Sequence, residues 1–394
     1  MTSEWRTIRA ADFIDFNPRL SLKKGDIATK VAMDKLKPFT KKIPETEKAE
    51  FNGGAKFCNG DTVMARITPC LENGKTAYVD MLDDGEIGFG STEFIVMRAK
   101  TGISDPQFVY YTAINPVFRN VAVKSMVGSS GRQRVQQSVL EELELSVPDL
   151  DEQRRIGDFL AKIDEKIALN DRINDNLEQQ AQSYFQELFV DNADPEWTTG
   201  TISDLGTVVG GSTPSKAKPE YYTESGIAWI TPKDLSNNKS KFVSHGENDI
   251  TELGLRNSSA SLMPEGTVLF SSRAPIGYIA IAAGEVTTNQ GFKSVVPKPE
   301  IGTPFVYFFL KNTLPVIEGM ASGSTFKEVS GSTMKNVPAV IPDAETLAKF
   351  SDFCAPIFAQ QRILEEQNQS LATLRDNLLP KLMSGEIDVS AVQL

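Results

Sequence analysis

The chain has 394 residues, which is more than one hydrophobic core usually holds and predicts two or three domains. Apolar residues make up 40% of it and no apolar run approaches the ~18 residues of a membrane helix, so no contact with a membrane is expected. The net charge of −11 argues at first against a nucleic-acid binder, and the three cysteines lack CxxC spacing, which favours reduced thiols in a cytoplasmic protein over disulfides or a zinc site.

The negative charge is unevenly distributed along the chain. Residues 1–148 have a net charge of +1 and residues 195–341 have −1, whereas residues 149–194 have −7 and residues 342–394 have −4. The acidity therefore lies in two segments that are predicted to be helical. The two nearly neutral regions can still present a basic surface locally.

The two nearly neutral regions have the pattern of mixed α/β domains. Short strand-like runs bounded by Gly, Pro, Asn and Asp are found at residues 62–67, 94–98, 267–271, 278–283 and 294–296. Residues 108–115 and 304–312 have the composition of short helices. We therefore predict an α+β fold with two similar domains.

The two acidic segments have the pattern of long amphipathic helices. Steps of four and three residues, averaging 3.5, are typical of a coiled-coil seam. The predicted seam contains Ile156, Leu160, Ile163, Ile167, Asn174, Leu177, Phe350, Ile357, Leu364, Asn368, Leu371 and Leu378. Asp149 and Asp343 are placed to begin these helices, and charged residues such as Asp164 are expected on a solvated face. The alternative is that each helix packs on the surface of its own domain.

The chain contains an internal repeat with an offset of 194 residues. The stretch Val147-Pro148-Asp149 recurs as Ile341-Pro342-Asp343, and the seam positions of the two helices match at the same offset. A tandem duplication with pseudo-twofold symmetry explains this pattern. We predict a first mixed α/β domain at 1–148, a central helix at 149–194, a second such domain at 195–341, and a helix with a tail at 342–394.

The inventory of reactive side chains argues against an enzyme. His245 is the only histidine, which excludes triads based on histidine and metal sites with several histidines. We predict no catalytic residue, no metal ligand and no cofactor bound by this chain.

Basic and polar residues in loops of the first domain could contact DNA. Residues 20–42 contain seven lysines and only two acidic residues, which could neutralise phosphates, although a solubilising surface loop is the alternative. The Gly/Ser-rich stretch 128–134 is expected to be a flexible loop whose Arg and Gln side chains could read guanine or adenine. The candidates in this domain are Lys23, Lys24, Lys30, Lys35, Arg66, Arg132, Gln133 and Arg134.

The second domain offers a different set of polar residues. The loop that corresponds to 128–134 is 322–327, and it retains a single basic residue. The candidates are Lys216, Lys218, Tyr221, Lys233, Arg273, Asn289, Gln290 and Lys327. The two domains differ most in these loops, as expected if each reads different bases.

Four motifs resemble those of type I restriction–modification specificity subunits. They are Pro148-Asp-Leu-Asp-Glu-Gln-Arg-Arg-Ile before a seam helix, Gly60-Asp-Thr-Val-Met-Ala-Arg-Ile-Thr-Pro-Cys, Trp229-Ile-Thr-Pro-Lys-Asp-Leu and the tail Leu378-Leu-Pro-Lys-Leu-Met. The order of domain, helix, domain and helix is the most specific element. The second copy departs from the pattern, because Glu345-Thr-Leu-Ala-Lys replaces the Glu-Gln-Arg-Arg stretch.

The resemblance implies a non-catalytic subunit that reads a bipartite double-stranded DNA site. Each domain would read one half, and an antiparallel pair of helices would set the gap. Two methyltransferase subunits using S-adenosylmethionine and restriction subunits using ATP and Mg would be its partners. The alternatives are a stand-alone DNA-binding regulator, which would usually show a helix-turn-helix or zinc module, and a structural coiled-coil scaffold.

Overall fold

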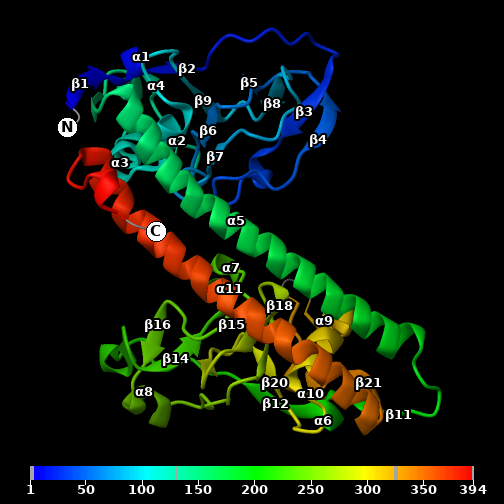
Figure 1. The fold of residues 1–394 in the computed structure, drawn as a ribbon. Helices are drawn as coiled ribbons and strands as arrows, with labels where there is room; N and C mark the ends of the chain where they lie inside the picture. The colour runs from blue at the N-terminus through cyan, green and yellow to red at the C-terminus, as the bar shows by residue number, and fades with distance from the viewer. Residues whose placement is uncertain (1–3, 130, 324–326, 393–394) are drawn as a thin grey trace. The chain divides into compact units, whose positions relative to one another are not determined.

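A computed structural model describes residues 4–129, 131–323 and 327–392, and the chain divides into two compact units. Unit 1 comprises residues 1–169 and 367–394, and unit 2 comprises residues 170–366. Each unit contains one mixed α/β domain and parts of both long helices, α5 (Leu150–Gln186) and α11 (Ala344–Ser384) (Figure 1). In the described ranges, no helix is long and apolar enough to cross a membrane.

The domain of unit 1 is built on two four-stranded sheets. The first has the order β2 (Ile14–Phe16), β9 (Phe94–Ala99), β6 (Thr62–Ala65), β7 (Thr76–Tyr78). The second has the order β4 (Glu47–Glu50), β3 (Ile27–Val31), β8 (Gly88–Gly90), β5 (Ala55–Phe57), and only its β3–β8 pair is parallel.

Short helices and one strand pair complete this domain. The helices are α1 (Ala10–Phe13), the 3₁₀ turn η1 (Met33–Lys35), α2 (Pro106–Ile114), α3 (Pro116–Lys124) and α4 (Gln137–Glu141). Strands β1 (Arg6–Arg9) and β10 (Glu144–Val147) pair antiparallel and bring the start of the domain beside its end. A further 3₁₀ turn, η4 (Val389–Ala391), follows α11 in the same unit.

Unit 2 repeats the order of the main sheet. Its sheets run β12 (Gly206–Gly210), β20 (Lys293–Pro297), β17 (Val268–Ser272), β18 (Ile276–Ala282), β15 (Phe242–Val243), and β13 (Tyr222–Thr223), β16 (Asn248–Ile250), β14 (Ile227–Ile230), β19 (Thr287–Thr288). Strands β11 (Thr198–Thr201) and β21 (Pro338–Ile341) pair antiparallel, as β1 and β10 do.

The remaining elements of unit 2 are helical. They are the π-helical turn η2 (Glu187–Asp191), α6 (Ile202–Leu205), the 3₁₀ turn η3 (Pro219–Tyr221), α7 (Pro232–Asn237), α8 (Glu252–Arg256), α9 (Thr303–Met320) and α10 (Gly331–Lys335). Strand β21 follows β10 at an offset of 194 residues. The predicted internal repeat and the predicted mixed α/β class are therefore confirmed.

Both long helices begin at the predicted acidic caps. The Asp149 carboxylate accepts a hydrogen bond from the backbone N–H of Glu152 at 2.9 Å, and Asp343 accepts one from the N–H of Thr346 at 2.9 Å. These caps satisfy backbone donors that lack a partner within the first helical turn.

The predicted seam residues are all buried or half-buried. Within unit 1, Ile156 and Leu160 of α5 share one apolar cluster with Leu382 of α11 and Phe108 of α2. Within unit 2, Ile357 of α11 shares a cluster with Ala181, Phe185 and the α9 residues Phe305 and Phe308. Each helix face therefore packs against both the other long helix and the adjacent domain, so the two arrangements weighed from the sequence coexist.

The chain direction of the two helices can be followed from paired positions. In unit 1, Asp164 contacts Arg375 and Ile167 contacts Asn368. In unit 2, Asn174 contacts Gln361 and Tyr184 contacts Phe350. Rising numbers on α5 meet falling numbers on α11, so the helices are antiparallel within each unit.

Candidate nucleic-acid interface

In unit 1, the loop before α4 is fastened to the turn after β6. Arg134 forms isolated β-bridges with Ile67 and Val127, and the N–H of Val135 donates to the carbonyl of Arg66 at 2.8 Å. The N–H of Gln133 donates to the Thr68 hydroxyl at 3.0 Å. The predicted flexible loop is therefore fixed from Gln133 onward, while Ser130 lies outside the described residues.

Glu93, immediately before β9, brings two predicted arginines together. Its carboxylate accepts hydrogen bonds from Arg134 Nε at 2.9 Å and Nη2 at 2.6 Å, and Arg66 Nε lies 3.6 Å away. The hydrogen bond from Arg134 lowers the pKa of Glu93, so this carboxylate stays ionised. Arg132 is exposed next to this cluster, and Gln133 is half-buried.

The lysine-rich segment of unit 1 is less positive than its sequence indicates. Lys30 pairs with Glu47 at 2.7 Å, and Lys35 forms a short ion pair with Glu45. Both glutamates lie after residue 42, so the count of charges over residues 20–42 did not include them. Lys23 and Lys24 are exposed and form no ion pair within the described ranges.

Unit 2 has a similar cluster, in which the carboxylate stands at the position that an arginine occupies in unit 1. Position 328 corresponds to position 134 at the offset of 194, and it holds a glutamate. Glu328 lies 3.4 Å from Arg273 of the β17–β18 turn and 3.8 Å from Lys293 of β20. Each unit thus has a carboxylate between two cations where a sheet turn meets the following loop. Lys327 is exposed beside it, and residues 324–326 lie outside the described ranges.

The other predicted residues of unit 2 differ in their exposure and in their contacts. Lys216 is exposed, and Lys233 pairs with Glu247 at 2.6 Å. Lys218 Nζ donates to the Tyr221 hydroxyl at 3.0 Å, but the Tyr221 side chain is only 4% exposed. Its ring packs inside the domain, so it presents no stacking surface.

The predicted Asn–Gln pair is also engaged locally. Asn289 Oδ1 accepts a hydrogen bond from the N–H of Gly291 at 2.8 Å and thereby shapes its own turn. Gln290 is exposed, and its side-chain oxygen accepts a short hydrogen bond from the Thr213 hydroxyl.

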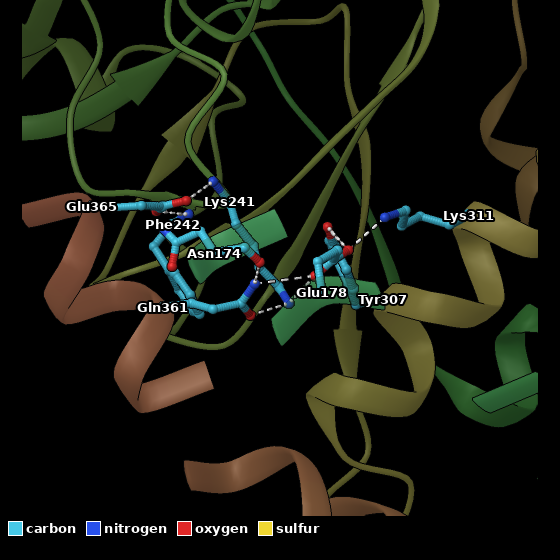
Figure 2. Close-up of polar contacts among 8 residues, drawn as sticks. All are labelled: Asn174, Glu178, Lys241, Phe242, Tyr307, Lys311, Gln361 and Glu365. Atoms are coloured by element: carbon cyan, nitrogen blue, oxygen red, sulfur yellow. Dashed lines mark hydrogen bonds and ion pairs between the residues drawn. The ribbon is translucent and has the colours of Figure 1, made fainter. Parts of the chain in front are cut away.

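A buried ion-pair network joins the domain of unit 2 to the helix pair. Lys241, only 7% exposed, donates to Glu178 of α5 at 2.8 Å and to Gln361 of α11 at 2.9 Å (Figure 2). Glu178 also accepts hydrogen bonds from Lys311 and from the Tyr307 hydroxyl. Burial lowers the pKa of Lys241 to about 8, and although burial opposes ionisation of Glu178, Lys241 and Lys311 bring its pKa down to about 2.

Unit 1 contains a counterpart built from other residues. Lys41 is 8% exposed, lies over the rings of Tyr110 and Tyr111, and bonds the Tyr111 hydroxyl at 3.2 Å. That hydroxyl donates to Asp164 at 2.6 Å, and Arg375 of α11 pairs with Asp164 at 2.6 Å. Asp164 is thus buried rather than solvated as expected, because Arg375 and Tyr111 supply the partners that a buried carboxylate needs.

The polar side chains of the described ranges suit binding to nucleic acid better than binding to a metal ion. No group of three or more His, Cys, Asp or Glu residues that could hold a metal ion is found in the described ranges. His245 lies 3.1 Å from the buried Asp249. The surface features of both units are paired arginines, lysines and amides, which suit contact with phosphates and base edges.

Comparison with known proteins gives a consistent result over most of the chain. The family model of the type I restriction modification DNA specificity domain matches residues 3–179 and 195–374. The chain is 38% identical over 194 residues to the MjaIX specificity subunit of Methanocaldococcus jannaschii, covering 47% of this chain and 45% of that subunit. This match therefore spans less than half of that relative's length.

Two further proteins are similar over nearly the full length. The HindI specificity subunit of Haemophilus influenzae is 25% identical over 407 residues, covering 83% of this chain and 86% of the relative. A crystal structure of a type I restriction-modification S subunit from M. genitalium has the same fold, with a TM-score of 0.56, 18% identity and 96% of each chain covered. With both of its halves matched by the family model, the chain belongs to the family of type I restriction–modification DNA specificity subunits.

Proposed function

We propose that the chain reads a bipartite double-stranded DNA site, with each unit reading one half. The observation that carries this proposal is the repeated cluster of one carboxylate and two cations at the same junction in both units. The residues differ between the copies, Arg66, Glu93 and Arg134 in one and Arg273, Lys293 and Glu328 in the other. Two similar clusters built from different side chains suit the recognition of two different half-sites.

The chain would act as a non-catalytic subunit that positions enzymes on DNA. Two adenine methyltransferase subunits would use S-adenosylmethionine, and restriction subunits would use ATP and Mg, while this chain would bind none of these cofactors. The acidic helices are ill-suited to phosphate contact, which favours a role in docking these subunits. The complex would work in the cytoplasm.

The helices would also set the spacing between the half-sites. Both α5 and α11 pass from one unit into the other, so their length fixes how much chain connects the two reading domains. A coiled-coil scaffold without a DNA role would not require a fixed spacing between two DNA-reading domains.

Co-expression with an adenine methyltransferase subunit tests this function. We expect the two proteins to co-purify and the host genome to gain methylated adenines in a two-part motif with a fixed gap. Specific DNA binding by the isolated chain without any methyltransferase would favour the regulator. Absence of any DNA preference in the co-purified complex would favour the scaffold.

A further inference from the structure

A groove in unit 1 lies next to the Arg66–Glu93 pair. It has a volume of about 560 Å³, and its polar lining includes Asn17, Arg19, Lys56, Arg66 and Thr92. These residues come from the segment after β2, from β5, from the end of β6 and from the approach to β9. Three of the five are cations, and none is a carboxylate.

Two of these cations have no acidic partner among the residues that the structure describes. Arg19 is exposed and forms no ion pair within the described ranges. Lys56 Nζ donates to the carbonyl oxygens of Leu20 at 2.9 Å and Leu22 at 3.3 Å, and lies 5.0 Å from the centre of the Phe51 ring. These neutral contacts hold the ammonium in place without neutralising its charge.

The third cation is left short of an acceptor. Because Arg134 already donates to both oxygens of Glu93, Arg66 remains 3.6 Å from that carboxylate. Arg66 Nε is buried and has no hydrogen-bond partner in the described part of the chain. The Arg66 side chain as a whole is 33% exposed and lines the groove, so its charge can still act on an acceptor bound there.

We propose that this groove binds a phosphodiester of one DNA strand through Arg19, Lys56 and Arg66. The inference rests on the proposed function and adds Arg19 and Lys56, which the loop sequences did not indicate, to the predicted Arg66. Charged donors around an open groove suit the non-ester oxygens of a passing strand. The contact would position the strand without reading bases, whereas the neighbouring Arg132–Arg134 loop would read them.

The test uses the complex of the full chain with its methyltransferase subunit. Fluorescence anisotropy would measure binding to a duplex that carries the methylated motif and to a scrambled duplex, at several salt concentrations. The variants are Arg19→Ala and Lys56→Met, and Lys124→Ala is the control, because Lys124 is an exposed cation of the same unit outside the groove lining. Urea midpoints would confirm that all variants remain folded.

Each groove variant should bind both duplexes about tenfold more weakly, as expected for loss of one charged hydrogen bond. The slope of log affinity against log salt should fall by about one per variant, with the methylated motif unchanged. Inorganic phosphate at matched ionic strength should not displace DNA, since displacement at millimolar concentration would mark a site for free phosphate instead. Affinities and slopes equal to those of the control would overturn the groove proposal while leaving the bipartite motif, and so the proposed function, intact.

Discussion

The Glu93 carboxylate accepts hydrogen bonds of 2.9 and 2.6 Å from Arg134, which lies 41 residues away in the sequence. The pair fixes the loop before α4 against the sheet, and it leaves the neighbouring Arg132 exposed. Arg134 is therefore held by an ion pair, whereas the Arg132 side chain is exposed to solvent. This difference separates the expected effects of replacing them.

Arg132→Ala should weaken DNA binding by the assembled complex. If the residue reads a base, the loss should be about 1–3 kcal/mol and confined to one position of one half-site. Arg134→Ala should cost more, because it also leaves Glu93 with only the more distant Arg66 to offset its charge. Anisotropy against a panel of singly substituted duplexes measures both effects. Unchanged affinity for both variants would remove this loop from the interface.

Glu178→Gln should destabilise unit 2 strongly. The variant leaves the buried Lys241 ammonium without a counter-charge, a change that typically lowers the free energy of unfolding by about 3–5 kcal/mol. Glu187→Gln, at an exposed position of the same chain segment, is the matched control and should change little. Urea unfolding measures the difference.

The same pair predicts an acid dependence. The folded pKa of Glu178 is about 2 against an ordinary value of 4.5, so its stabilising contribution is present above pH 4.5 and is lost as the pH falls towards 2. The gap in stability between the wild type and Glu178→Gln should narrow over that range. A constant gap would show that Glu178 stabilises the unit by some means other than its charge.

The lowered pKa of Lys241 predicts that the stability of unit 2 also changes at alkaline pH. Its folded pKa is about 8, below its ordinary 10.5, so between these values the unfolded chain binds more protons than the folded one. Stability should therefore rise as the pH increases from about 8 to 10.5. Lys241→Met should rise less over this range than the wild type in urea midpoints taken at each pH. Parallel curves would contradict the burial of a charged lysine at this site.

Asn174→Leu should raise the stability of the helix pair. Asn174 Oδ1 is buried without a hydrogen-bond partner in the described part of the chain, and removing such a group recovers about 1–3 kcal/mol. Asn368→Leu should gain less, because Asn368 Nδ2 donates to the carbonyl of Ile167 at 3.4 Å. The double variant should be more stable and discriminate gap length less strictly, since polar seam residues fix register. Lower melting temperatures for both single variants would show that the seam needs these amides.

The sequence predicted the parts of the fold that depend on short-range patterns. The predicted strand at residues 62–67 is β6 (Thr62–Ala65), the helix at 108–115 is α2 (Pro106–Ile114), and both long helices begin after their predicted Asp caps. Periodicity and capping are local signals, so one sequence suffices to reveal them. The helix at 304–312 was predicted too short, because α9 continues through Pro315 to Met320.

The candidate site depends on contacts that local patterns cannot reveal. Glu93 reaches Arg134 across 41 residues and Glu328 reaches Arg273 across 55, and nothing near either arginine marks its partner. The burial of Lys41 and Lys241 could not be predicted either, because lysines in polar segments normally face solvent. Arg19 and Lys56 became candidates only when the fold placed them along one groove.

Methylome sequencing of cells carrying a lengthened helix pair tests the bipartite reading most directly. Four residues inserted after Leu169 and four after Glu366, where the chain divides between units, leave the internal residues of each unit unchanged. The insertion adds ~6 Å to each helix and nearly preserves its phase, although it introduces a stutter in the heptad repeat. Because a base pair advances the duplex by ~3.4 Å, the gap of the methylated motif should lengthen by about one or two base pairs while both half-site sequences stay the same. An unchanged gap, or altered half-sites with the original gap, would contradict two reading units spaced by these helices.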